Sequence, residues 1–345
     1  MEKNNCCCSP GTPCPSASPP AQTGPFPALS TVLGWKDVLG GWRVRWGIRR
    51  NRYTVPPGLY RIGEPDKTAP VLVTANYKLT VDQVRRELTG WNLWLLVLDT
   101  HGINVWCAAG KGTFGTEELI RRLQAVGLAQ VVEHRRLILP QLGAVGVAAH
   151  EVARATGFSV HYGPVLARDL PAYLAAGRKA TPEMRRVPFG WKERMVLVPN
   201  ELKSHLKKAL GILLALAALQ WFEDGNLNRH LAVDFAPFLA AILAGGVFVP
   251  LFLPWLPSRV FAVKGAIAGA LCVVAVLAAW PGTAMEMAGA ALIAIALASY
   301  LGMMFTGSTT FTNQAGTQRE VRWALPFILV VAALGSALRI AAAFI

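Results

Sequence analysis

Eight consecutive residues combine one thiol with a run of very small side chains. In order they are Asn104, Val105, Trp106, Cys107, Ala108, Ala109, Gly110 and Lys111. The small side chains after Cys107 leave room for a large, flat ligand to lie against the backbone, with the sulfur directed at its centre. A helix is expected to begin beside Cys107, and Lys111 follows on the next turn, so both neighbours favour the thiolate over the thiol. Because a thiolate binds metal ions and a thiol does not, these residues predict a metal site.

These eight residues resemble the signature of the mercury-methylating corrinoid proteins, and three other segments extend the resemblance. The segments are residues 74–80, 137–150 and 161–165, which are also similar to the related corrinoid iron-sulfur proteins. The resemblance covers about residues 35 to 200. It implies a bound cobalamin with its own base displaced and Cys107 as the catalytic residue and lower axial ligand of cobalt. It also implies that a methyl group carried on cobalt is transferred to mercury(II).

The thiolate fits this implied chemistry. A thiolate gives more electron density to cobalt than an imidazole does, which favours transfer of the methyl group as a carbanion to a soft electrophile such as mercury(II). The resemblance further implies an iron-sulfur, ferredoxin-like reductant and a methyltetrahydrofolate-linked methyl donor. The sequence itself has no cysteine spacing for an iron-sulfur cluster and no flavin or nicotinamide fingerprint. The reducing electrons are therefore expected from a partner protein.

Other interpretations of this stretch remain open. A single cysteine at a strand end is most often a small, buried, apolar residue. A phosphate-binding P-loop would need Gly and Ser or Thr at the positions of Val105 and Gly112. Residues 99–104 approach the Asp-x-His-x-x-Gly pattern of histidine-ligated cobalamin proteins, but Asn104 replaces the closing Gly. His101 therefore ranks below Cys107 as a cobalt ligand.

The elements that must position Cys107 read as alternating strands and helices. Strands are expected at residues 70–75, 94–99, 130–133, 136–139 and 158–162. Helices are expected from the cap Thr80 to residue 88, from the cap Thr116 to Gly127, over residues 143–154, and after Pro164 to residue 175. This alternation predicts an α/β domain with an open, largely parallel sheet, which binds ligands beyond the carboxyl ends of its strands.

Several polar residues, glycines and a proline fall at those strand ends and are the expected contacts of the cofactor. Besides the eight residues above, they are Thr74, Asn76, Thr80, Gly143, Gly146, Gly163 and Pro164. Each glycine taken alone is also explained by a turn that requires a positive φ.

Two segments near the amino end of the chain are expected to differ from this alternation of strands and helices. Residues 1–34 are rich in Pro, Ser and Cys and read as a disordered tail. The four cysteines of the tail, Cys6, Cys7, Cys8 and Cys14, are either plain thiols of that tail or a trap for a soft metal ion. Residues 42–46 alternate between aromatic or apolar and basic side chains, which favours a short strand in an entry hairpin.

The carboxyl-terminal part of the chain has the composition of a membrane domain. The whole chain is 53% hydrophobic and only 16% charged. Five apolar spans are expected in residues 203–345, at about 209–222, 231–253, 260–280, 284–305 and 324–344. Basic residues near their ends fall on one side if the domain at residues 35–202 is cytoplasmic, so the carboxyl end is expected outside the cytoplasmic (inner) membrane.

The net charge of +14 lies almost wholly before residue 209, because only six basic and five acidic residues follow it. The basic residues are scattered in pairs without a nucleic-acid-binding pattern, so no nucleic acid is expected as a partner. They suit the anionic lipid of the cytoplasmic leaflet and an acidic ferredoxin, although a merely solvated basic surface is equally ordinary.

Three other functions stay open at this point. One is a membrane-tethered corrinoid methyl carrier of one-carbon metabolism with another acceptor. The second is a cobalamin-binding transport or sensor module, and the third is a structural membrane protein with a buried Cys107.

Overall fold

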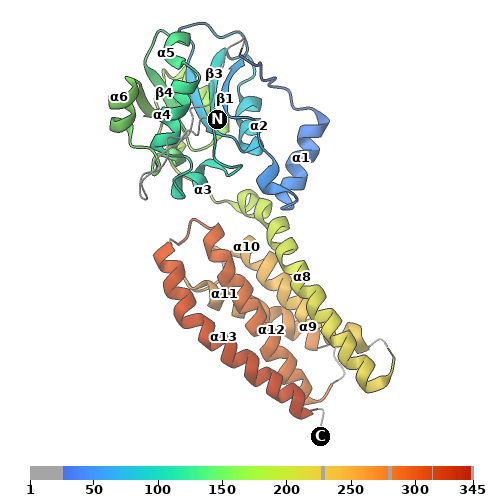
Figure 1. Cartoon of the computed structure of the whole chain (residues 1–345). Helices are drawn as coiled ribbons and strands as arrows, with labels where there is room; N and C mark the ends of the chain where they lie inside the picture. Colours follow the sequence, from blue (N-terminus) through green and yellow to red (C-terminus); the bar gives the residue numbers. More distant parts are fainter. Residues whose placement is uncertain (1–25, 227–229, 279–281, 313, 343–345) are drawn as a thin grey trace, which may run out of the picture. The chain divides into compact units, whose positions relative to one another are not determined.

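The computed structural model describes residues 26–226, 230–278, 282–312 and 314–342 (Figure 1). The four cysteines of the expected tail lie outside these residues. The described residues up to Val44 and Arg49–Arg186 form one compact unit, called here the α/β unit. Arg45–Ile48 and the described residues from Val187 onwards form the second, called here the helical unit.

The α/β unit is built on a five-stranded sheet of order β1-β3-β2-β4-β5. Its strands are β1 (Gly58–Ile62), β2 (Val71–Ala75), β3 (Leu93–Leu98), β4 (Arg136–Leu139) and β5 (Ser159–Tyr162). Strand β1 is antiparallel to β3, whereas β3, β2, β4 and β5 are parallel. Every residue of β2 and β3 is buried, as expected of apolar strands covered on both faces. The prediction of an open, largely parallel sheet is confirmed.

Helices cover both faces of this sheet (Figure 1). They are α2 (Lys78–Glu87), α3 (Val105–Gly110), α4 (Thr116–Ala125), α5 (Leu128–Val131), α6 (Ala149–Thr156) and α7 (Leu170–Ala175). Short 3-10 turns lie at Arg50–Arg52, Gln141–Gly143, Ala167–Asp169 and Glu183–Arg185. Side chains of α3, α4 and α6 pack on one face, and side chains of α2 and α7 pack on the other.

Several predicted elements are wrong in detail. The strand expected at residues 42–46 is part of helix α1 (Trp35–Arg45), whose inner side packs against Tyr53. The first half of the strand expected at 130–133 belongs to α5. The helix expected at 143–154 begins only at Ala149, as α6, after a 3-10 turn that ends at Gly143. Helix α2 begins two residues before its expected cap Thr80, because Tyr77 is the N-cap.

A network of ion pairs joins α1 to α2. Lys78 Nζ lies 2.6 Å from Asp37 and 2.7 Å from Asp82, while Arg85 lies 2.7 Å from Asp37 and 2.8 Å from Asp82. Burial raises the pKa of the Asp37 carboxyl, but the hydrogen bonds from Lys78 and Arg85 outweigh burial and hold this pKa at about 2. The network therefore fixes the orientation of α1 on the α/β unit.

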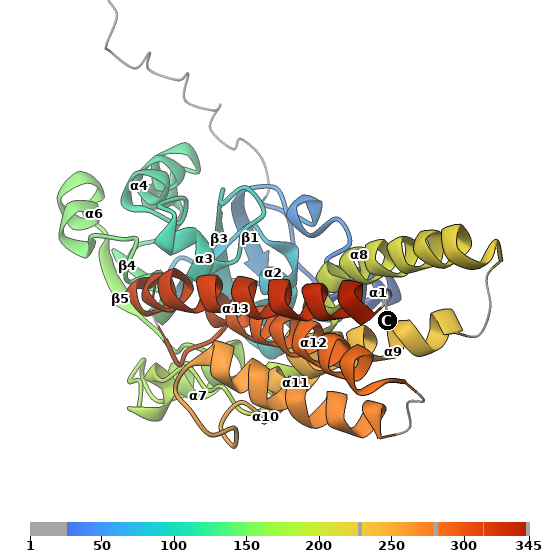
Figure 2. The same cartoon turned by 90° about the horizontal axis from the view of Figure 1, so that it is seen from below.

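The described part of the helical unit is helical and mostly apolar. Its helices are α8 (Trp191–Asp224), α9 (His230–Leu243), α10 (Val249–Phe252), α11 (Phe261–Leu277), α12 (Ala284–Met304) and α13 (Gln314–Ala342), with a π-helical turn (Ala244–Phe248) before α10 and a 3-10 turn (Phe305–Ser308) after α12. Helix α12 lies between α11 and α13 (Figures 1 and 2). Close approach is possible because glycines face one another, as Gly265 and Gly302 do between α11 and α12.

Three segments in the described part of the chain are long and apolar enough to cross a membrane. They are Asp234–Phe252, Ala284–Gly307 and Ala315–Ala342, and the apolar helix Phe261–Leu277 is shorter. The expected span at 209–222 forms the second half of α8, which begins with charged residues. The predicted all-α carboxyl-terminal region is confirmed, whereas a count of five spans stays a prediction.

Candidate functional site

Helix α3 follows the end of β3 through a loop that Asn76 holds in place. The buried amide oxygen of Asn76 accepts hydrogen bonds from Thr100 N at 3.1 Å and Gly102 N at 3.0 Å, and its amide nitrogen donates to Asp99 Oδ1 at 3.1 Å. Asn104 then caps α3, because its side-chain oxygen accepts from Cys107 N at 3.0 Å. Asn76, which the sequence suggests as a cofactor contact, is thus a positioning residue for the loop that leads to Cys107.

The six residues of α3 divide cleanly between two sides of the helix. Val105, Ala108 and Ala109 are buried in the core beneath the helix. The exposed residues, with Lys111 after the last turn, are Trp106, Cys107, Gly110 and Lys111. The two alanines therefore seat the helix on the protein, and only Gly110 leaves open space on the side that carries the sulfur.

Two of the glycines predicted to contact the cofactor are required because they pack against α3 and the turn after it. A Cβ at Gly146 would lie 3.0 Å from Ala109 Cα and even closer to the carbonyl oxygen of Phe114, and a Cβ at Gly143 would lie 2.6 Å from the Phe114 ring. Glycine at these positions lets residues 143–146 approach α3 closely. A Cβ at Gly163 would similarly lie 3.1 Å from Ile138.

A cavity of about 210 Å³ opens at the carboxyl ends of β2 and β4. The helix that follows β2 covers one face of the sheet, and the helix that follows β4 covers the other. Such a switch in connection is where open α/β sheets bind ligands. The predicted residues that line the cavity are Thr74, Thr80, Asn104, Val105, Trp106 and Pro164.

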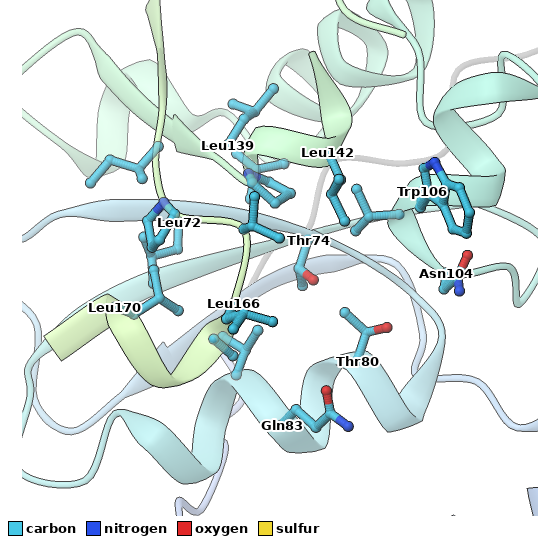
Figure 3. A pocket seen from close by; sticks show the side chains of 18 residues that line it. Leu72, Thr74, Thr80, Gln83, Asn104, Trp106, Leu139, Leu142, Leu166 and Leu170 are labelled. Carbon is cyan, nitrogen blue, oxygen red and sulfur yellow. The ribbon is translucent and has the colours of Figure 1, made fainter. Parts of the chain in front are cut away.

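The cavity has a polar side and an apolar side. Figure 3 shows Thr74, Thr80, Gln83 and Asn104 along one part of its wall. Most of the remaining wall is apolar and includes five leucines, Leu72, Leu139, Leu142, Leu166 and Leu170 (Figure 3). A ligand group with an apolar body and a few hydrogen-bonding atoms suits this lining.

Some residues that line the cavity were not predicted from the sequence. Gln83 lies one helical turn after Thr80 and therefore shares its face, which is a signal the helix period could have supplied. Leu166 and Leu170 come from the segment after β5, and no local pattern indicates that this segment folds back over the cavity. The predicted residues outside the lining are Asn76, Cys107, Ala108, Ala109, Gly110, Lys111, Gly143, Gly146 and Gly163.

Cys107 lies beside the cavity without being part of its wall. Asn104, Val105 and Trp106 line the cavity, and the exposed Cys107 is the next residue of α3. No cluster of three His, Cys, Asp or Glu side chains that could hold a metal ion occurs in the described residues. The Cys107 thiol thus lies on an open surface next to the cavity, outside any such cluster of metal-binding side chains.

Residues 48–174, which include both the cavity and α3, match a family described as CO dehydrogenase/acetyl-CoA synthase delta subunit. A gamma subunit of the acetyl-CoA decarbonylase/synthase complex from Methanopyrus kandleri is 38% identical over 150 residues, which are 42% of this chain and 32% of the relative. The corrinoid/iron-sulfur protein large subunit of Moorella thermoacetica is 33% identical over 137 residues, 37% of this chain and 29% of the relative.

The chain is a relative of the corrinoid/iron-sulfur protein large subunit. The predicted relationship to corrinoid proteins is confirmed. The chain spans less than a third of the length of either relative. Mercury appears in neither name, so methyl transfer to mercury stays a prediction.

Proposed function

We propose that this protein is a corrinoid-dependent methyltransferase that forms methylmercury from mercury(II), with the Cys107 sulfur as the lower axial ligand of the cobalt. One observation supports this proposal most strongly. Cys107 is exposed on α3, beside a cavity at the carboxyl end of the sheet, in a unit related to a corrinoid protein. Thiolate sulfur is a soft metal ligand, which suits this role.

The residues around Cys107 fit a large flat cofactor. Gly110, one helical turn after Cys107, has no heavy atom within 4 Å of a Cβ built on it, so the surface of α3 is open beside the sulfur. The cavity of about 210 Å³ is smaller than an ordinary ligand pocket of roughly 300 Å³ or more, so it suits one arm of a ligand whose body lies outside. Thr74, Thr80 and Gln83 would hydrogen-bond that arm.

The chain's own contribution is to orient the sulfur of Cys107. Asn76 and Asn104 fix the loop and the first turn of α3, so the sulfur of Cys107 has a defined position. Trp106, which is 47% exposed, offers a flat apolar surface next to it. The bound corrinoid supplies methyl transfer, and its chemistry is tuned by the ligand that the protein provides. A thiolate donates more charge than an imidazole and so favours transfer to mercury(II).

We further propose that the helical unit spans the cytoplasmic (inner) membrane several times, with the α/β unit in the cytoplasm. Three segments long and apolar enough to cross a membrane support this location. A cytoplasmic α/β unit would have access to a methyltetrahydrofolate-linked methyl donor and to an iron-sulfur, ferredoxin-like reductant. Its excess of basic residues suits an acidic ferredoxin.

The test compares Cys107→Ala and Cys107→His with the control Cys272→Ala, in which the other cysteine of the described residues is replaced. Cys107 is exposed, so its replacement is expected to change stability by less than about 0.5 kcal/mol. The corrinoid absorption spectrum should shift in both Cys107 variants, and methylmercury formation should collapse. In Cys107→His, cobalamin should be retained while transfer falls. A normal spectrum and near-normal turnover in Cys107→Ala would refute the assignment.

The second candidate is a corrinoid methyl carrier of one-carbon metabolism that serves another acceptor. The name of one relative, a gamma subunit of an acetyl-CoA decarbonylase/synthase complex, favours it. Both functions require Cys107 and the same spectrum, so the spectrum cannot separate them. Purified protein loaded with a methyl group and offered mercury(II) separates them directly, because only the first candidate yields methylmercury.

A further inference from the structure

Helix α1 carries an exposed apolar stripe. Trp35, Val38, Leu39 and Trp42 are 71%, 61%, 43% and 55% exposed. They follow the i, i+3, i+4, i+7 spacing that places side chains on one side of a helix. Exposed apolar side chains that gather in this way mark a surface that contacts another apolar phase or partner.

The opposite side of α1 is fixed to the α/β unit, so the stripe is held outward. Asp37 pairs with Lys78 and Arg85 of α2, and Val44 is buried. A Cβ at Gly40 would lie 2.8 Å from the Tyr53 ring, so glycine allows α1 to pack closely there. Rotating the helix to hide the stripe would break these ion pairs. The exposure of the stripe is therefore built into the fold.

Basic side chains border the stripe and continue after the helix. Lys36 and Arg43 are exposed and lie next to it on the helix, because each directly follows a stripe tryptophan. Arg49, Arg50 and Arg52 are exposed in the segment that follows. The acidic residue of α1 is Asp37, which faces inward and is paired. The outer side of α1 thus combines tryptophan and leucine with positive charge.

We infer that α1 lies flat in the interface of an anionic lipid leaflet and holds the α/β unit on the membrane. Tryptophan is enriched at the level of the lipid headgroups, and helices with an apolar face bordered by Lys and Arg bind anionic membranes in this way. The positive border argues for lipid over an apolar protein partner, because anionic headgroups complement it. The segments that can cross a membrane belong to the same chain, so a leaflet stays within reach of α1.

The test uses the full chain in nanodiscs that contain phosphatidylglycerol, with bromine atoms on the upper part of the acyl chains. Bromine quenches the fluorescence of tryptophan at short range. The measured signal is the difference between the wild-type protein and the double variant Trp35→Phe/Trp42→Phe, which isolates the two tryptophans of the stripe. The matched control is Trp91→Phe, which removes a partly buried tryptophan of the same unit. Aqueous iodide serves as the complementary quencher.

If α1 lies in the lipid interface, the difference signal should be quenched by brominated lipid and protected from iodide. The signal removed by Trp91→Phe should not be quenched by brominated lipid. Quenching by iodide alone would show that the stripe faces water, and would overturn the inference. Quenching by neither reagent would show that protein covers the stripe, either the helical unit or a second copy, and would overturn it equally.

The charged border provides an independent readout. Lys36→Gln/Arg43→Gln leaves both tryptophans in place but removes two charges, so partition of α1 onto the anionic surface should fall by roughly 30-fold. Bromine quenching should then weaken, and it should weaken in the wild type when salt is raised or phosphatidylcholine replaces phosphatidylglycerol. If bromine quenching is the same in the variant as in the wild type and does not change with salt, the role assigned to these charges is refuted.

Discussion

Replacing Gly110 by alanine separates the stability of the fold from the binding of the cofactor. Gly110 is exposed, ends helix α3, and has no heavy atom within 4 Å of a Cβ built on it. Alanine there restricts the unfolded chain without meeting any neighbour, which should stabilise the cofactor-free protein by about 0.4 to 1 kcal/mol. Amide protons of β2 and β3 should then exchange roughly 2- to 5-fold more slowly.

Cofactor binding should change in the opposite direction. Gly110 lies one helical turn after Cys107 on the exposed side of α3. A flat ligand centred on the sulfur would meet the added methyl group, and overpacking of this kind costs about 1 to 3 kcal/mol. The dissociation constant for cobalamin should therefore rise roughly 5- to 150-fold.

The assay titrates hydroxocobalamin into the cofactor-free protein by absorbance, and follows stability by amide hydrogen exchange in β2 and β3, because global unfolding would mix the two units. Gly146→Ala is the matched control. Its Cβ would collide with the backbone of Phe114 and Ala109, so it should destabilise the α/β unit. If Gly110→Ala binds cobalamin normally while its stability rises, the cofactor does not lie over α3. A loss of stability in Gly110→Ala would instead refute the inference that this surface is open.

Three further predictions test other parts of the molecule. Because hydrogen bonds hold the pKa of Asp37 at about 2, below its ordinary 3.8, the α/β unit should lose about 2 kcal/mol as the pH falls from about 4 to about 2, seen as faster exchange in β2 and absent in Asp37→Asn. Reporter fusions should read periplasmic at Gly282 and cytoplasmic at Gly307, and the reverse would place the α/β unit away from folate and reductant. Removal of residues 1–30 should leave cobalamin content and methyl transfer nearly unchanged, whereas a raised KM for mercury(II) would show that the tail delivers metal.

The sheet was predictable because its central strands have a composition that only burial explains. Residues 71–75 and 93–98 are almost wholly apolar runs, too short for separate helices and flanked by helical patterns. Every residue of both strands is buried, since helices cover the two faces of the sheet. Parallel pairing follows from the connecting helices, which carry the chain back to the starting edge.

Helix α1 was not predictable, because its local pattern is ambiguous. Residues 42–46 alternate as a strand would, while residues 35–42 repeat at helical spacing. Distant contacts decide between the two. Asp37 pairs with Lys78 and Arg85, which lie 41 and 48 residues later in the chain, and these pairs orient a helix. The usual sequence signal of a surface helix is an apolar stripe that faces the core. In α1 this stripe is exposed, and the side that faces the α/β unit is formed largely by small and charged residues.

The glycines and alanines near Cys107 show that a small residue type can predict a close contact but cannot tell whether a ligand or another part of the protein makes it. The sequence suggested Gly143 and Gly146 as contacts of the cofactor, with a turn as the alternative reason for each glycine. The structure identifies the approaching group at Gly146 as α3 itself, through Ala109, with the segment at Phe114. A small residue is required equally by a ligand and by a neighbouring helix, and a single sequence cannot distinguish them.

The two sides of helix α3 therefore have small residues for two different reasons. Its buried side must be small, since Ala108 and Ala109 lie against the core and Gly146. The glycine on its exposed side, next to the thiol, has a different reason. No protein atom would touch a side chain at Gly110, so packing does not require a small residue there. Gly110 does not adopt a positive φ, so neither its backbone conformation nor its neighbours require glycine there. A ligand lying over the sulfur of Cys107, as proposed, would explain both the glycine and the exposed thiol.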